Sequence, residues 1–140
     1  MTVTVTDDGT PNLADTATID ITINPVNDNT PVAVDDSYGP VAEGGVLSVP
    51  AAGVLGNDTD GDLPGDTLQA LLVTDVSYGV LALLPDGSFT YTHDGSENFT
   101  DSFTYEVSDA AGNTDTATVT ITITPQNDAP TAVGDAFTVG

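Results

Sequence analysis

The C-terminal half of the chain alternates hydrophobic and polar residues. In segment 116–124 the apolar positions are Ala117, Val119, Ile121 and Ile123, and threonines occupy most positions between them. Successive side chains of a β-strand point to opposite faces, and β-branched residues favour strands. The segment is therefore predicted to be a strand with one buried face.

Similar patterns, separated by turn-forming residues, mark further strands. Phe89 and Tyr91 share one face of segment 87–92, which follows the turn residues Pro85-Asp86-Gly87. No segment shows the 3.6-residue period of a helix. The predicted strands are 16–24, 36–40, 45–49, 67–74, 79–84, 87–92, 101–108 and 116–124. This pattern predicts an all-β, antiparallel, immunoglobulin- or cadherin-like β-sandwich, with Phe89, Tyr91, Phe103 and Tyr105 in one core.

The chain also contains an internal repeat. Residues 15–28 recur at 115–128 with ten of the fourteen positions identical, so the period is about 100 residues. That is the length of a seven-strand sandwich. We therefore predict a tandem array, divided into the C-terminal strands of a preceding repeat (1–26), a linker (27–31), a complete repeat (30–126), and a linker with the first strand of a following repeat (127–140). Prolines flank both linkers, which predicts stiff joints.

Composition narrows the classes of partner. The 140 residues include 22 Asp and Glu, no Lys or Arg and no Cys, which gives a formal net charge of −22. Such a charge favours disorder, but the alternating strands and the 39% hydrophobic content indicate a folded chain. Nothing in the chain could neutralise the phosphates of a nucleic acid. No apolar run approaches the ~20 residues that span a bilayer, so direct membrane insertion is not expected.

The missing cations make metal binding a natural expectation. Carboxylates that cluster without Lys or Arg must stay apart in water or share a metal ion. The loop 57–62 carries Asp58, Asp60 and Asp62 at alternate positions, and Ca²⁺ takes about six to eight oxygen ligands. The loop resembles the start of an EF-hand, but Gln69 stands where that loop needs Glu, and no helix pattern flanks it. The competing interpretation is that these acids are solvated residues that begin turns.

Several motifs resemble one family. They are Asp-x-x-Gly-Asn at 109–113, the strand Thr-Ala-Thr-Val-Thr-Ile-Thr-Ile at 116–123, the Asn-Asp-Ala-Pro joint at 127–130, and the segments 33–38, 42–45, 53–62 and 86–91. Together they resemble the cadherin-like tandem repeats of giant bacterial surface proteins and adhesins. The resemblance covers 30–126 and extends into both flanks. It implies a secreted protein at the cell surface or in the extracellular space.

The resemblance also implies where metal ligands would gather. Asp58, Asp60 and Asp109 would lie beside the joint 27–29, which resembles the Asp-x-Asn-Asp-Asn joint of animal cadherins except that Pro25 replaces the first Asp. At the other end Glu43 would approach the joint 127–129, where Ala129 replaces the final Asn, with Glu97 or Asp101 as further candidates. The expected Ca²⁺ ligands, including Asp62 of the acidic loop, are Asn27, Asp28, Asn29, Glu43, Asp58, Asp60, Asp62, Asp109, Asn127 and Asp128.

These observations favour a structural function. The leading hypothesis is a calcium-rigidified spacer of an extracellular adhesin or surface fibre that supports cell adhesion. Its partners would be the adjacent repeats of the same chain, with homophilic or fibre contacts as further candidates. The alternatives are a module that binds carbohydrate or protein through its loops, and a self-assembling filament subunit. No catalytic constellation is visible, so no enzyme is expected, and His93, the single histidine, is interpreted as a surface or packing residue.

Overall fold

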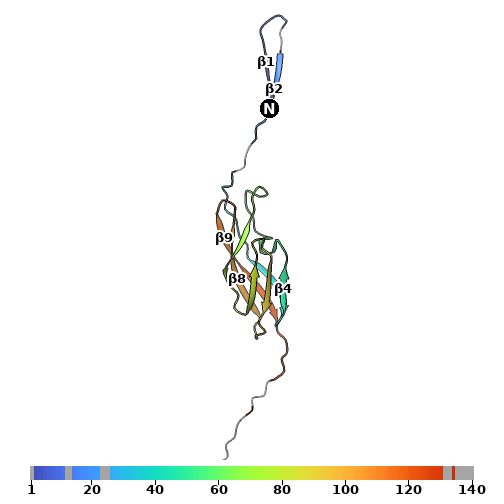
Figure 1. The fold of residues 1–140 in the computed structure, drawn as a ribbon, viewed down its shortest axis with the longest axis vertical. Helices are drawn as coiled ribbons and strands as arrows, with labels where there is room; N and C mark the ends of the chain where they lie inside the picture. Colours follow the sequence, from blue (N-terminus) through green and yellow to red (C-terminus); the bar gives the residue numbers. More distant parts are fainter. Residues whose placement is uncertain (1, 12–13, 23–25, 131–133, 135–140) are drawn as a thin grey trace, which may run out of the picture.

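A computed structural model describes residues 2–11, 14–22, 26–130 and 134, and it consists of a two-stranded hairpin followed by a β-sandwich (Figure 1). The strands are β1 (Thr2–Thr6), β2 (Ala14–Thr18), β3 (Asp36–Ala42), β4 (Val46–Val49), β5 (Gln69–Thr74), β6 (Gly79–Leu83), β7 (Phe89–His93), β8 (Thr100–Ser108) and β9 (Thr114–Thr124). One short 3₁₀ helix, Gly53–Leu55, lies between β4 and β5. Within the described residues, no helix is long and apolar enough to cross a membrane.

Two sheets form the sandwich. One has the order β3-β9-β8-β5 and the other the order β4-β7-β6. Alternating residues of the long strands β8 and β9 are buried, as predicted. Phe89 of one sheet meets Phe103 of the other edge to face, with ring centroids 5.5 Å apart, a geometry that aromatic pairs prefer. Tyr91 and Tyr105 complete the predicted aromatic core, and both are fully buried.

One strand pair differs from the expected antiparallel arrangement. β3 pairs with β9 in parallel, whereas the other ladders between named strands are antiparallel. β3 is the first and β9 the last of the seven strands of the sandwich. The chain enters at one end of the sandwich and leaves at the opposite end (Figure 1), so its first and last strands run in the same direction.

The N-terminal hairpin reproduces part of the sandwich. Val3 and Val5 of β1 lie opposite Ala17 and Asp15, just as Tyr105 and Val107 of β8 lie opposite Ala117 and Asp115. β2 ends at Thr18, earlier than the predicted strand 16–24. Its partner β1 begins at Thr2, and among the described residues no third strand pairs with β2 as β3 pairs with β9. Part of that prediction, residues 23–25, lies outside the described residues. Most of the strand predicted within 127–140 also lies outside the described residues. Residues 126–130 are described and contain no strand.

Candidate metal sites

Among the described residues, six acidic side chains gather in two groups of three, one at each end of the sandwich. The N-terminal group contains Asp60, Asp66 and Asp109, and the C-terminal group contains Glu43, Glu97 and Asp128. Glu97 precedes strand β8 and Asp109 follows it. A strand of nine residues spans about 30 Å, so the two groups are separated by the length of β8.

The N-terminal group brings three carboxylates together in a partly enclosed position. One oxygen from each of Asp60, Asp66 and Asp109 lies within 4.8 Å of the others. Asp66 and Asp109 are each only 8% exposed. Like charges at such distances repel, more strongly where water is excluded. The chain has no Lys or Arg, so no lysine or arginine side chain within it can compensate that charge.

Two buried oxygen atoms at this end of the sandwich have no hydrogen-bond partner among the described residues. They are Oδ2 of Asp60 and Oδ1 of Asn27, a residue of the linker. A cavity of about 40 Å³ is lined there by Val26, Asn27, Asp62, Gly65 and Asp66. Buried polar atoms without a partner are uncommon and costly. Unpaired oxygens beside three carboxylates are the donors that a hard divalent cation takes, so the residues fit such an ion.

Asp62 fastens the linker to the sandwich. Its carboxylate accepts hydrogen bonds from the backbone N–H groups of Asp28 (3.0 Å) and Asn29 (2.9 Å), and from Nδ2 of Asn29 (2.8 Å). The bonds from Asn29 lead the causes that lower the pKa of Asp62. A Cβ on Gly61 would lie 2.7 Å from Cγ of Asn29, so the close approach of loop and linker requires glycine there. Asp62 therefore holds the linker in place and stands outside the three-carboxylate group.

Hydrogen bonds favour the ionised form of Asp109. Asn113 donates to it from its backbone N–H and from Nδ2, both at 2.7 Å, and Nδ2 also donates to the carbonyl of Asn29 at 3.2 Å. Burial opposes ionisation, but the hydrogen bonds from Asn113 and from neighbouring backbone N–H groups outweigh it and lower the pKa of Asp109. The linker is thus tied to the metal-ligand candidate through Asn113.

Asp58, a predicted ligand, does not join this group. It is buried and accepts hydrogen bonds from the backbone N–H of Val34 (2.8 Å) and the hydroxyl of Tyr105 (2.9 Å). Burial raises the pKa of Asp58. Burial and the nearby charge of Asp58 also raise the pKa of Asp36 to about 6. These two acids and Tyr105 form an interior network, and the donors that satisfy Asp58 direct it toward the core.

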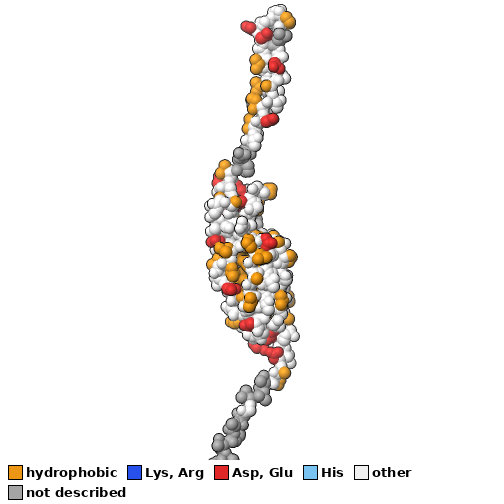
Figure 2. Space-filling model, viewed as in Figure 1, with side chains coloured by type: hydrophobic (Ala, Val, Ile, Leu, Met, Phe, Trp, Pro, Cys, Tyr) orange, Lys and Arg blue, Asp and Glu red, His pale blue; other side chains and the backbone are white. Residues whose placement is uncertain are grey.

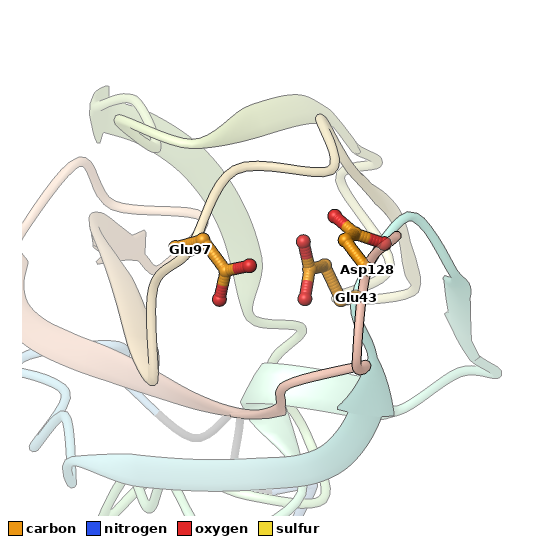
Figure 3. Close-up of side chains that lie close together, drawn as sticks. All are labelled: Glu43, Glu97 and Asp128. Carbon is orange, nitrogen blue, oxygen red and sulfur yellow. The ribbon is translucent and has the colours of Figure 1, made fainter. Parts of the chain in front are cut away.

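The C-terminal group is more open. Figure 3 shows the carboxylates of Glu43, Glu97 and Asp128 facing one another, and one oxygen of each lies within 4.8 Å of the others. Glu43 also accepts a hydrogen bond from the backbone N–H of Gln126 at 2.8 Å. Glu97 and Asp128 are exposed, and acidic side chains are visible in Figure 2 where the chain leaves the sandwich. The group therefore brings together carboxylates from two loops and from the linker within 127–140.

Other predicted residues take different places. Asn127 of the linker is exposed, and its role as a ligand stays a prediction. Asp101 accepts hydrogen bonds from the backbone N–H groups of Ser77 and Tyr78 and from the hydroxyl of Tyr91, so it belongs to the interior. Asp28 contacts Asp62 through its backbone N–H, and Asn29 does so through both its backbone N–H and its side-chain Nδ2. The sequence reasoning did not single out Asp66, because neither its spacing nor a motif distinguishes it from other loop acids.

Comparison with known proteins identifies the family. Residues 27–125 match the model of the bacterial cadherin-like domain, and the chain belongs to that family. It is 44% identical to human Protocadherin Fat 1 over 62 residues, which make up 44% of this chain and 1% of that protein.

The fold is also found in solved cadherin structures. The chain resembles PcdhgB3 EC1-4 with a TM-score of 0.60 and 24% identity, covering 88% of this chain and 31% of that one. It resembles Protocadherin Gamma B2 extracellular cadherin domains 3-6 with a TM-score of 0.58 and 16% identity, covering 89% and 33%. The chain thus spans about a third of these structures, and the cadherin-like sandwich is the shared feature.

Proposed function

We propose that this chain is a calcium-rigidified spacer of an extracellular adhesin or surface fibre that supports cell adhesion. The observation that carries the proposal is the pair of acidic groups at opposite ends of the sandwich. The N-terminal group is connected to a linker through Asn113, and the C-terminal group includes Asp128 of the other linker. A metal ion in either group would connect the sandwich to the segment that leads to its neighbour. Binding to the folded form would also stabilise it by mass action.

The ligand chemistry favours Ca²⁺. Both groups offer carboxylate oxygens, and neither contains His or Cys, the ligands typical of zinc sites. Asp60, Asp66, Asp109 and Oδ1 of Asn27 would hold the ion at the N-terminal end; Glu43, Glu97 and Asp128 would hold it at the C-terminal end. Each set supplies fewer residues than the about six to eight oxygens that Ca²⁺ takes, which leaves room for bidentate carboxylates, backbone oxygens, water or an adjacent repeat.

The hairpin supports the tandem arrangement that the spacer requires. β1 and β2 share the register of β8 and β9, and residues 15–28 repeat the sequence of 115–128. The apolar side chains of Val5 and Ile21 are about 70% exposed (69% and 70%), whereas their counterparts Val107 and Ile121 are fully buried. We infer that the hairpin is the last strand pair of a preceding repeat, whose other strands would cover this face. Adjacent repeats are then the first partners of the domain, and its role is non-catalytic.

Calorimetric titration of the chain with Ca²⁺, together with thermal melting with and without a chelator, tests the proposal. We expect binding and a higher melting temperature in millimolar Ca²⁺. Glu106→Gln is a control that removes one negative charge from β8, where Glu106 lies opposite Thr116 and belongs to neither acidic group. Scattering from a chain of several repeats should show a longer, straighter particle with Ca²⁺. Identical melting and scattering with and without Ca²⁺ would refute the metal-dependent spacer and leave the acids as a solvated surface.

A further inference from the structure

His93 is a buried histidine beneath the loops that carry two members of the C-terminal acidic group. Its side chain is fully buried at the end of β7. Its Nδ1 atom accepts hydrogen bonds from the backbone N–H of Gly44 at 3.1 Å and from that of Gly95 at 3.2 Å. An apolar side chain could fill the same space, but it could not accept these two hydrogen bonds. We therefore ask what the two bonds do.

The two donors come from different loops. Gly44 follows Glu43 in the turn between β3 and β4, and Gly95 precedes Glu97 in the loop between β7 and β8. Both glycines have positive φ, +66° and +84°, although a Cβ at either position would meet nothing within 4 Å. Left-handed backbone is readily adopted by glycine. Glycine is therefore needed at these positions for the backbone conformation that carries the two N–H groups bound by Nδ1.

The hydrogen bonds fix the chemical form of the imidazole. Nδ1 accepts from two donors, so it carries no proton, and the ring proton lies on Nε2. Nε2 is buried without a hydrogen-bond partner among the described residues, and Oδ1 of Asp94 lies 3.9 Å away. The backbone N–H of His93 itself donates to the carbonyl of Gly45 at 3.0 Å. His93 thus contacts the Glu43 turn through both its backbone and its side chain.

We propose that His93 is the positioning residue of the C-terminal metal site, holding the Glu43 turn and the Glu97 loop at the separation that lets both carboxylates bind one divalent cation. The inference rests on the proposed function. His93 does not touch the cation; it acts through Gly44 and Gly95. Groups that orient metal ligands change metal affinity by about 10–100-fold when removed, so His93 sets the affinity of this end alone.

Three variants in the full chain separate this role from simple packing. His93→Leu fills the space but provides no acceptor. His93→Asn places an amide oxygen near the position of Nδ1 and should restore the two hydrogen bonds. His93→Gln keeps a polar amide but moves its oxygen away from that position. Titration with Ca²⁺, followed by NMR shifts at residues of both acidic groups, measures each affinity in one molecule, and amide exchange of Gly44 and Gly95 without metal reports on the hydrogen bonds.

The expected result for His93→Leu is fast exchange at Gly44 and Gly95 and about tenfold weaker Ca²⁺ binding at the C-terminal group, with the N-terminal affinity unchanged. His93→Asn should retain both. If His93→Leu does not fold, His93→Gln takes its place: it should show the fast exchange and the weaker C-terminal Ca²⁺ binding that His93→Asn does not show. Two results would overturn the role of His93 but not the proposed function. One is an equal loss of Ca²⁺ affinity at both groups; the other is an unchanged C-terminal affinity although Gly44 and Gly95 exchange fast. Absence of Ca²⁺ binding by the unmodified chain would overturn the proposed function as well.

Discussion

The two acidic groups differ in how the fold prepares them. At the N-terminal end the carboxylates are partly buried, Asn113 and Asp62 tie them to the linker, and two oxygens lack partners. At the C-terminal end Glu97 and Asp128 are exposed, and Glu43 accepts a hydrogen bond from Gln126, the residue before the linker. Burial strengthens the interaction of carboxylates with a cation, whereas water weakens it. We therefore infer that the N-terminal group is the more preorganised half of a joint and the C-terminal group the more adaptable half.

The largest expected effect comes from a change in the core, which supports both acidic groups. Phe103→Ala empties a site that is 1% exposed, between the sheets whose strand ends carry the two groups, and it should cost about 3–5 kcal/mol of unfolding free energy. Urea unfolding measures the loss. Phe99→Ala is the control, because Phe99 is 68% exposed and should cost less than about 0.5 kcal/mol. Similar losses from the two variants would contradict the core assignment.

The next largest effect should be a loss of Ca²⁺ affinity at the N-terminal group only. Asp109→Asn keeps the size of the side chain but removes one of three negative charges from the N-terminal group. We expect at least about tenfold weaker Ca²⁺ binding there, or about 1.4 kcal/mol, with the C-terminal affinity unchanged. Calorimetry and NMR titration measure both. Retention of wild-type affinity at the N-terminal end would show that Asp109 only organises the loop of Asn113.

A third change tests whether a partly buried acid, Asp36, affects stability independently of metal binding. The pKa of Asp36 is raised to about 6 from 3.8 by burial and by Asp58, so the folded chain takes up a proton at higher pH than the unfolded chain. The stability contributed by this group increases as the pH falls from about 7 toward 4. Asp36→Asn should therefore stabilise the apo domain at pH 7 by about 1 kcal/mol, after allowance for solvent screening.

Urea unfolding of the Asp36→Asn variant at pH 7 and pH 5, with a chelator present, checks the sign. Its stability should also vary less with pH than that of the unmodified chain. A variant that is less stable at pH 7 would mean that the ionised Asp36 contributes more through the hydroxyls of Tyr38 and Tyr105 than its burial costs.

The smallest effect should be at the exposed end. Glu97→Gln removes a charge that is in contact with water, so the C-terminal affinity for Ca²⁺ should fall severalfold, corresponding to less than about 1 kcal/mol. The N-terminal affinity should not change. A loss larger than that of Asp109→Asn would reverse the proposed order of the two ends.

Much of the sandwich could be predicted from the chain because strand periodicity is a local property. The alternation in 101–108 and 116–124 identified the inward faces of β8 and β9, and the aromatic pairs were correctly assigned to the core. The parallel pairing of β3 with β9 could not be read in this way, since it depends on where the chain enters and leaves the sandwich. Strand ends also depend on partners, as the early end of β2 shows.

The candidate sites were harder to predict because they depend on side-chain direction. Asp60 and Asp109 were expected near the N-terminal linker, and the structure brings them together with Asp66. Asp58 lies two positions from Asp60, yet Val34 and Tyr105 hold it in the interior. No local pattern indicates which of two neighbouring loop acids finds donors in the core. His93 was interpreted as a surface or packing residue, and the structure shows it buried; its two glycine partners could not be predicted, because they come from different loops.

The parallel pairing of β3 and β9 has a mechanical consequence for a chain pulled at both ends. Tension would enter beside β3 and leave at the end of β9, so it would act along these two strands in opposite directions. The hydrogen bonds between them lie across that direction and would be loaded in shear, sharing the load instead of opening one after another. The sandwich should therefore resist extension through the strand pair that connects its entry to its exit, with or without a bound ion.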